Sequence, residues 1–240
     1  MNSREKTQLL LKSKEWFTNV VAINHIQNTR KLINIDEFNV NPFLSTYLAN
    51  FLTGNSDPLS IAKALVYPRV LGTSITTSFG TNIQKFTTDV LSAFGSTTSG
   101  IDIEFVDCLD GQKKYCQLKA GPNTINKDDV ETVAGHFKDV INLSRTNNLS
   151  LSFDNMIVGI IYGMENELSG HYKRITSQYH FPVKIGQDFW VRLTGDHNFY
   201  YELIKSISEV ATECDFSHEL NEVITELSQS EIIQSLSSNT

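Results

Sequence analysis

The chain has 240 residues, of which 40% are apolar and 20% are charged, and its formal net charge is -7. This composition fits one compact globular domain, with or without a helical addition, and it excludes a disordered chain, a collagen and a coiled-coil array. No apolar run approaches the roughly 20 residues that cross a bilayer, and the N-terminus lacks the apolar stretch of a secretory signal, so we expect a cytoplasmic protein.

The negative charge is concentrated at the C-terminal end. From Tyr200 to Thr240 there are eight acidic residues and one lysine, whereas the first 199 residues hold 19 basic and 19 acidic residues. A neutral body with a local basic face still binds a polyanion, especially where divalent cations join the contact. The acidic balance therefore does not exclude nucleic acid as a partner.

The first part of the chain predicts helices. Apolar residues recur at helical spacing from Leu9, from Phe43 and from Leu59, and a Gly-Asn-Ser-Asp-Pro break precedes the last of these stretches. A clearer helix is expected over residues 79–94, whose apolar residues fall on one face. They are Phe79, Ile83, Phe86, Val90 and Phe94.

A β-hairpin is predicted next. Residues 101–106 alternate apolar and acidic, Asp110-Gly111 is a strong turn signal, and residues 114–119 alternate again. The two strands are therefore expected to pair antiparallel.

The remaining elements complete an α/β pattern. Asn126 is a good cap for a helix that ends near Asn147, and residues 156–162 form an apolar run that suits a central strand covered on both faces. A further strand is expected near residues 181–185, an aromatic segment follows, and two acidic helices end the chain. We therefore predict a mixed central sheet flanked by helices. The predicted parts are a helical region over 1–72 that contributes to dimerisation, a core over 73–199 and acidic C-terminal helices over 200–240.

The hairpin brings together side chains that carry chemistry. Residues two apart share a strand face, so Asp102 and Glu104 project together, as do Gln117 and Lys119 on the partner strand. A carboxylate is a hard oxygen ligand for Mg²⁺, which neutralises charge on a phosphate and makes a bound water a better nucleophile. This set suits metal-assisted phosphodiester hydrolysis. Asp102 is the first candidate ligand, Glu104 and Gln117 and the carbonyl of Leu118 are further ones, and Lys119 would orient or polarise the water.

At these residues the sequence resembles the PD-(D/E)xK nuclease superfamily. Asp102 stands for the motif aspartate, and after fourteen intervening residues Gln117-Leu118-Lys119 stands for (D/E)xK. The resemblance implies a restriction-endonuclease-like core, whose order of helix, hairpin, helix and strand matches the order predicted above.

Two positions depart from the motif. Ile101 replaces the proline, which only shapes the entry to the strand. Gln117 replaces an acid, and a neutral amide is a weaker Mg²⁺ ligand. Glu104 from the neighbouring strand, or Gln84 or Asp89 from the preceding helix, is expected to compensate.

A narrower resemblance covers about residues 41–203. It is carried by the strings Asn41-Pro42-Phe43, Pro68-Arg69-Val70-Leu71-Gly72, Leu118-Lys119-Ala120-Gly121, Val158-Gly159-Ile160-Ile161-Tyr162-Gly163, Tyr172-Lys173-Arg174-Ile175 and Phe189-Trp190. These look like strings of orthodox type II restriction endonucleases that cut GGNCC-centred sites. The resemblance implies double-stranded DNA as substrate, Mg²⁺ dependence, a homodimer with one active site per subunit, and a staggered break with 5′ phosphates. It also implies a companion DNA methyltransferase.

Two segments are candidates for contact with DNA. The loop after the second hairpin strand offers polar groups suited to phosphates or base edges, and a basic and aromatic cluster follows the buried strand. The candidates are Asn123, Thr124, Asn126, Lys127, His171, Tyr172, Lys173 and Arg174. Each segment also has a plain reading as an ordinary or solvated turn.

Three other readings stay open. Asp102 and Glu104 can form the wet face of an edge strand with Lys119 as their salt partner. Gln117 can mark a lost metal site in a non-catalytic DNA-binding protein. The same chemistry also serves a structure-selective repair nuclease of the superfamily.

Overall fold

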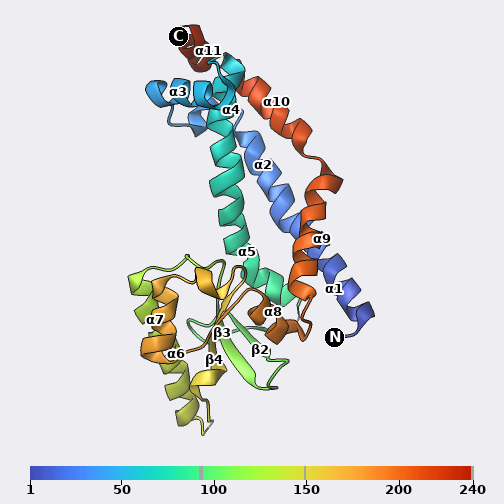
Figure 1. The fold of residues 1–240 in the computed structure, drawn as a ribbon, viewed down its shortest axis with the longest axis vertical. Helices are drawn as coiled ribbons and strands as arrows, with labels where there is room; N and C mark the ends of the chain where they lie inside the picture. The colour runs from blue at the N-terminus through green and yellow to red at the C-terminus, as the bar shows by residue number, and fades with distance from the viewer. Residues whose placement is uncertain (92–93, 149, 239–240) are drawn as a thin grey trace. The chain divides into compact units, whose positions relative to one another are not determined.

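The computed structural model describes residues 1–91, 94–148 and 150–238. The chain forms two compact units, one made of Met1–Trp16 with Gly80–Ile207 and the other of Phe17–Phe79 with Ser208–Thr240. Figure 1 shows their elements as a ribbon. Within the described part of the chain, no helix is long and apolar enough to cross a membrane.

The first unit is built on a five-stranded mixed sheet. Its strands, in spatial order, are β1 (Phe94–Gly95), β2 (Ile103–Val106), β3 (Lys113–Lys119), β4 (Met156–Ile160) and β5 (Val183–Ile185). The first three pair antiparallel, whereas β3, β4 and β5 pair parallel. The predicted hairpin, central strand and mixed sheet are therefore confirmed. All residues of β4 are buried, which agrees with its apolar composition.

Helices cover both faces of this sheet. On one face, α6 (Lys127–Thr146) and α7 (Gly170–Tyr179) pack on β4 through one apolar cluster that includes Phe137, Val158 and Tyr172. On the other face lies α8 (Gln187–Thr194), where the ring of Phe189 packs edge-on against Phe105 of β2. The predicted flanking of the sheet by helices is thus observed (Figure 1).

The start of α6 follows from its cap. The side chain of Asn126 accepts the backbone N–H groups of Asp128 and Asp129, and the Asp129 carboxylate accepts the N–H of Asn126 in return. This reciprocal capping box satisfies donors that the first helical turn leaves free. The helix therefore begins where the sequence predicts, directly after β3 and its loop.

The second unit is helical. Its core joins α2 (Ile23–Lys31), α3 (Pro42–Thr53) and α4 (Pro58–Pro68) to the late helices α10 (Ser217–Ser228) and α11 (Glu231–Ser238). Ile61 of α4 and Leu227 of α10 are both fully buried in that core. Helices α10 and α11 each bury apolar residues in this core and pack on α4.

The grouping of the chain differs from the three parts expected from sequence. The C-terminal helices belong with the N-terminal ones, and α1 (Ser3–Trp16) belongs with the sheet, where Trp16 contacts Phe86 of α5 (Ile75–Asp89). The boundary between the units falls inside α5 and inside α9 (Phe199–Cys214). Such contacts link residues far apart in sequence, so periodicity does not reveal them.

Several local elements also differ from prediction. The helix expected over 79–94 ends at Asp89, and residues 92–93 lie outside the described part of the chain. The expected loop begins with β1, and the aromatic segment is α8. Three late helices (α9, α10 and α11) take the place of the two that were expected.

Candidate active site

Asp102 lies one residue before β2 and is fixed to β3 by backbone and side chain. Its N–H donates to the carbonyl of Cys116 at 2.9 Å, and its Oδ2 accepts the N–H of Leu118 at 2.7 Å. Its own carbonyl accepts the side chain of Gln84 on α5 at 2.8 Å. No hydrogen bond to its Oδ1 occurs among the described residues, so one carboxylate oxygen is left for a ligand.

The strand register places Glu104, Gln117 and Lys119 on one face of the sheet. Glu104 pairs with Tyr115 and Ile103 with Cys116, and residues directly opposite in an antiparallel pair project to the same side. Asp102 precedes the paired part of β2, and its side chain reaches β3 at the N–H of Leu118, between Gln117 and Lys119. Lys119 follows Gln117 by two residues on the same face, as the alternation predicts.

Glu104 is already engaged within the hairpin. Lys113 Nζ is 2.6 Å from its Oε2, and the Ser96 hydroxyl donates to its Oε1 at 2.6 Å. Burial raises the pKa of Glu104, but the hydrogen bonds from Lys113 and Ser96 outweigh it and leave that pKa below its ordinary value. With both oxygens occupied, Glu104 stabilises the hairpin and is a poor candidate for the metal ligand expected from sequence.

Gln117 is buried, and its amide nitrogen has two acceptors. Nε2 donates to the carbonyl of Gly100 and lies 3.0 Å from Nδ1 of His136 on α6. Within the described residues, Oε1 has no hydrogen-bond partner. Sequence does not single out His136, because nothing in it shows that α6 packs over β3 at this point.

Lys119 ends β3 and is partly exposed. In the part of the chain that the structure describes, its ammonium has no ion pair or hydrogen bond. The partner of Glu104 is Lys113, so the reading of Lys119 as a cross-strand salt partner of these acids is wrong. A cation without an internal partner at this position is available for a phosphate or a water.

The donor set near Asp102 fits a hard divalent cation. Oδ1 of Asp102 and Oε1 of Gln117 are both oxygens without an internal partner, and the adjoining backbone of Leu118 offers its carbonyl. No group of three or more His, Cys, Asp or Glu residues able to hold a metal occurs among the described residues. Mg²⁺ is commonly bound by one or two carboxylates together with waters and substrate phosphates, so this small set suits it. Gln84 and Asp89 of α5 were the two further ligand candidates from sequence. Gln84 donates its side-chain N–H to the backbone carbonyl of Asp102, and Asp89 accepts a hydrogen bond from the hydroxyl of its neighbour Thr88.

The loop after β3 is supported from inside by Tyr172. This residue is completely buried, its hydroxyl donates to the carbonyl of Gly121 at 3.2 Å, and it is 2.9 Å from the Thr124 hydroxyl. Burial raises the pKa of Tyr172 to about 12. The assignment of Tyr172 to the DNA contacts is thereby corrected, since a fully buried ring cannot reach a duplex.

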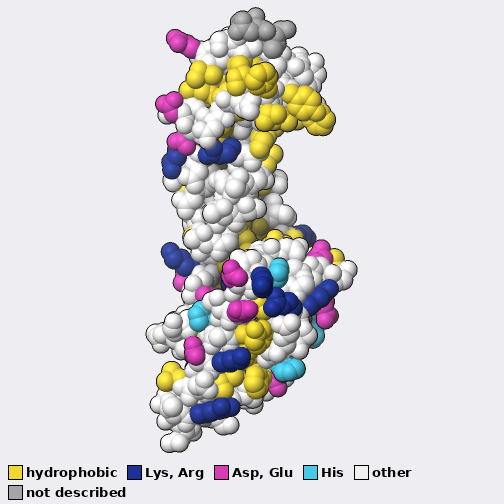
Figure 2. All heavy atoms as spheres, turned by 90° about the vertical axis from the view of Figure 1, so that its left-hand side faces the viewer, with side chains coloured by type: hydrophobic (Ala, Val, Ile, Leu, Met, Phe, Trp, Pro, Cys, Tyr) yellow, Lys and Arg dark blue, Asp and Glu magenta, His cyan; other side chains and the backbone are white. Residues whose placement is uncertain are grey.

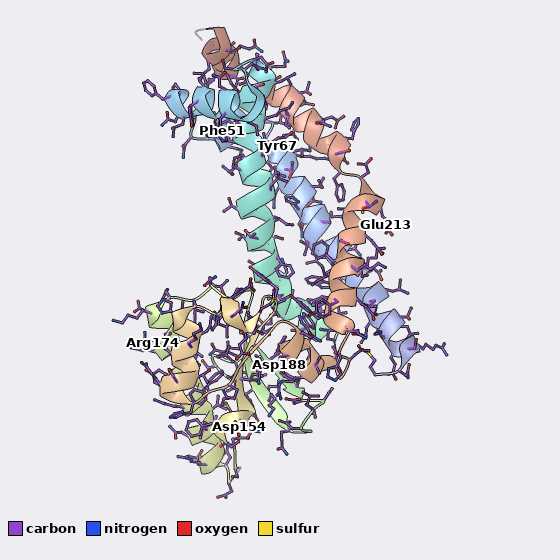
Figure 3. The ribbon with its side chains drawn as sticks, viewed as in Figure 1. Phe51, Tyr67, Asp154, Arg174, Asp188 and Glu213 are labelled. Carbon is purple, nitrogen blue, oxygen red and sulfur yellow. The ribbon has the colours of Figure 1, made fainter. Side chains whose placement is uncertain are left out.

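The other candidate contacts are more open. In the loop, Asn123 and Lys127 are exposed, while Asn126 is exposed and caps α6. On α7, Lys173 is exposed and Arg174 is partly exposed. Figure 3 labels Arg174. His171 is partly buried, and its Nδ1 is a buried atom without a hydrogen-bond partner among the described residues. Sequence alone did not indicate that this cluster forms a helix, because Gly170 opens the helix and only two of the helix residues are buried.

Comparison with known proteins adds one finding. The profile of the family described as Type II restriction endonuclease EcoO109I matches residues 39–215, about three quarters of the chain. Among curated proteins, none matches the chain significantly. The matched range includes β1 to β5 and every candidate site residue.

Proposed function

The chain belongs to the family of the type II restriction endonuclease EcoO109I, and from this premise we propose that it cuts double-stranded DNA with Mg²⁺ at Asp102, Gln117 and Lys119. Membership confirms the resemblance to type II restriction endonucleases and the restriction-endonuclease-like core expected from sequence. The chain is thus a site-specific nuclease whose partner is DNA.

One observation carries the assignment of the site. Asp102 is fixed to β3 through Leu118, which leaves its Oδ1 without an internal partner beside Gln117 and Lys119. That bond supports the proposal that a carboxylate oxygen, an amide oxygen and an ammonium act together at this end of β3. Glu104, which shares the sheet face of Gln117 and Lys119, is held by Lys113 and Ser96 and is left out of the proposal.

The residues act as follows on a bound phosphodiester. Asp102 and Gln117, with the carbonyl of Leu118, would hold the cation, which would supply positive charge against the phosphate and make a water more acidic. The ammonium of Lys119 donates to the attacking water or to a phosphate oxygen and so orients the attack. The water oxygen adds to phosphorus as the bond to the 3′ oxygen breaks, and the proton that the water loses is balanced by one that the 3′ oxygen gains, which leaves a 5′ phosphate and a 3′ hydroxyl.

The DNA backbone is proposed to contact the loop after β3 and the exposed side of α7. Asn123 and Lys127 are exposed at the loop, with Thr124 and Asn126 beside them, and His171, Lys173 and Arg174 lie along α7. Figure 2 shows lysine, arginine and histidine side chains gathered with acidic ones on the surface of the sheet-containing unit. A GGNCC-centred site and a companion methyltransferase remain proposals that rest on the resemblance.

We further propose a homodimer formed through α3. Ser45 and Ala49 of this helix are buried, while apolar side chains cover its other side. The aromatic residues of that face are 63–87% exposed and its leucines 42–56% exposed. The α3 face consists of Phe43, Leu44, Tyr47, Leu48, Phe51 and Leu52.

Area and charge favour a second copy as the partner of the α3 face. Its three aromatic side chains alone expose on the order of 450 Å², and its leucines bring it toward the roughly 800 Å² that each partner contributes to a stable interface. The helix has no charged residue, so two copies related by a twofold axis meet without repulsion. Figure 2 shows hydrophobic side chains gathered on this unit, and Figure 3 marks Phe51 on α3.

Digestion of one sequenced plasmid tests the function. With Mg²⁺ the purified chain should give discrete fragments whose ends, read by run-off sequencing, share one sequence and carry 5′ phosphates. Removal of Mg²⁺ by a chelator should stop the reaction. Binding of DNA without cleavage in the presence of every divalent metal tested would favour a non-catalytic DNA-binding protein. Cutting of junctions or flaps without sequence preference would favour a structure-selective repair nuclease.

A further inference from the structure

The orientation of the Gln117 amide is fixed by what surrounds it. The carbonyl of Gly100 can only accept a hydrogen bond, so the atom of Gln117 that faces it must be the nitrogen. The same nitrogen lies 3.0 Å from Nδ1 of His136, which therefore accepts the second amide proton and carries its own proton on Nε2. Both N–H bonds of Gln117 are thus used, and Oε1 faces away from these two partners.

His136 is itself held in place by its helix and by Gly100. Its neighbours Val133 and Phe137 are buried core residues of α6, so the ring position is set by the packing of that helix on the sheet. A Cβ added at Gly100 would overlap the imidazole of His136, and the φ of Gly100 is +76°. Only glycine allows the chain to bring the Gly100 carbonyl and the imidazole to the same amide.

The geometry points to His136 as a positioning residue that, with the carbonyl of Gly100, holds Oε1 of Gln117 free for a divalent cation at Asp102. This inference rests on the proposed function and adds a physical reason for the glutamine at the motif position. A metal ligand needs a fixed oxygen, and partners around a ligand that fix its orientation raise metal affinity. Here two acceptors fix a neutral amide, where the superfamily motif has a carboxylate.

The same geometry predicts the effect of restoring the acid. In Gln117→Glu, a carboxylate oxygen would replace Nε2 and face the Gly100 carbonyl, which can only accept, so this contact would become repulsive even if His136 moved its proton to Nδ1. The side chain would be repelled from its position. We therefore expect Gln117→Glu to bind Mg²⁺ more weakly than the parent, although a carboxylate is intrinsically the better ligand.

Metal affinity in a non-cleaving background tests the inference. The full chain with Lys119→Ala is bound to a DNA duplex that the wild type cuts, and Mg²⁺ is titrated by calorimetry. Adding His136→Ala should weaken Mg²⁺ binding by about 10- to 100-fold. Adding His136→Asn should restore most of it, because the asparagine Oδ1 falls close to the position of Nδ1 and also accepts. Gly135→Ala is the matched control, since a Cβ there meets nothing within 4 Å.

A second readout follows Gln117 directly. In the ¹⁵N spectrum of the metal-free protein, both side-chain amide protons of Gln117 should be shifted from the positions of a solvent-exposed glutamine and should exchange slowly with water. In His136→Ala, one of the two protons should lose its shift and its slow exchange. Gly100→Ala is a second variant, because its added Cβ would displace the imidazole of His136 while residue 136 stays histidine. If His136→Ala leaves the Gln117 signals and Mg²⁺ affinity as in the parent, His136 has no positioning role, even though the wild type cuts DNA. If instead the wild type never cuts and Asp102→Asn leaves Mg²⁺ uptake unchanged, the proposed function itself fails and the inference falls with it.

Discussion

The Oδ2 atom of Asp102 accepts the backbone N–H of Leu118 at 2.7 Å. This bond fixes the carboxylate to β3 at the residue between Gln117 and Lys119. The aspartate is thus held by the backbone of the strand that carries the other two candidate groups. A side chain fixed in this way loses little conformational freedom when it binds a cation, which favours binding.

Glu104→Gln should destabilise the fold and leave cleavage largely intact. Glu104 has a lowered pKa, so its ionised form contributes stability above the ordinary value of 4.5, and this contribution is lost as pH falls through the lower pKa of the folded state. At pH 7 the variant should lose about 1 kcal/mol of unfolding free energy. Denaturant unfolding from pH 7 to pH 3 should show this difference shrinking toward zero.

Lys113→Met is the partner variant for this test. It should lose a similar amount at pH 7, because it removes the cation that holds Glu104 at 2.6 Å. If Glu104→Gln abolishes cleavage while its stability is unchanged, Glu104 is a metal ligand and its assignment to the hairpin is wrong.

Tyr172→Phe and Lys173→Ala should separate support of the loop from contact with DNA. The tyrosine hydroxyl is bonded to Gly121 and Thr124, so its loss should cost about 1 kcal/mol of stability. The salt dependence of DNA binding should not change, since the ring is buried. Lys173→Ala should lower the slope of log K against log salt by about 1. Fluorescence anisotropy across a salt series measures both, and an unchanged slope for Lys173→Ala would remove Lys173 from the phosphate contacts.

Phe51→Asp should convert the dimer into a monomer. A charge at a side chain that is 79% exposed barely affects the fold of one chain, but in the proposed interface it would be buried without a partner. We expect a loss of at least about 2 kcal/mol, roughly 30-fold in the dimer dissociation constant. Light scattering after size exclusion measures it. Leu109→Asp, at a 53% exposed turn residue of the sheet-containing unit, is the control. A wild type that is monomeric at all concentrations, or a Phe51→Asp variant that stays dimeric, contradicts the role of the α3 face.

The features that sequence predicted are those encoded locally. Alternation and the Asp110-Gly111 turn specify the hairpin, the cap at Asn126 specifies the start of α6, and a run of β-branched residues specifies β4. Each depends on neighbours in the chain, and each is observed.

The features that sequence missed depend on contacts between distant residues. Lys113 and Lys119 look equally suited to pair with Glu104, and only the strand register chooses Lys113. The bond of His136 to Gln117 requires α6 to pack over β3, and the burial of Tyr172 requires α7 to be a helix on the same face. The polar residues around Tyr172 are equally compatible with a turn, so sequence alone does not predict α7.

The most direct test of the active site compares two acidic residues that lie two positions apart in the chain. Single-turnover cleavage with Mg²⁺ is measured for Asp102→Asn and for Glu104→Gln on a fragment that the wild type cuts, with binding of the fragment checked for each. The account predicts a rate lower by roughly 100-fold or more for Asp102→Asn, which removes the charge next to the cation, and a rate within a few fold of wild type for Glu104→Gln. Equal rates for the two variants, or wild-type cleavage by Asp102→Asn, would contradict it.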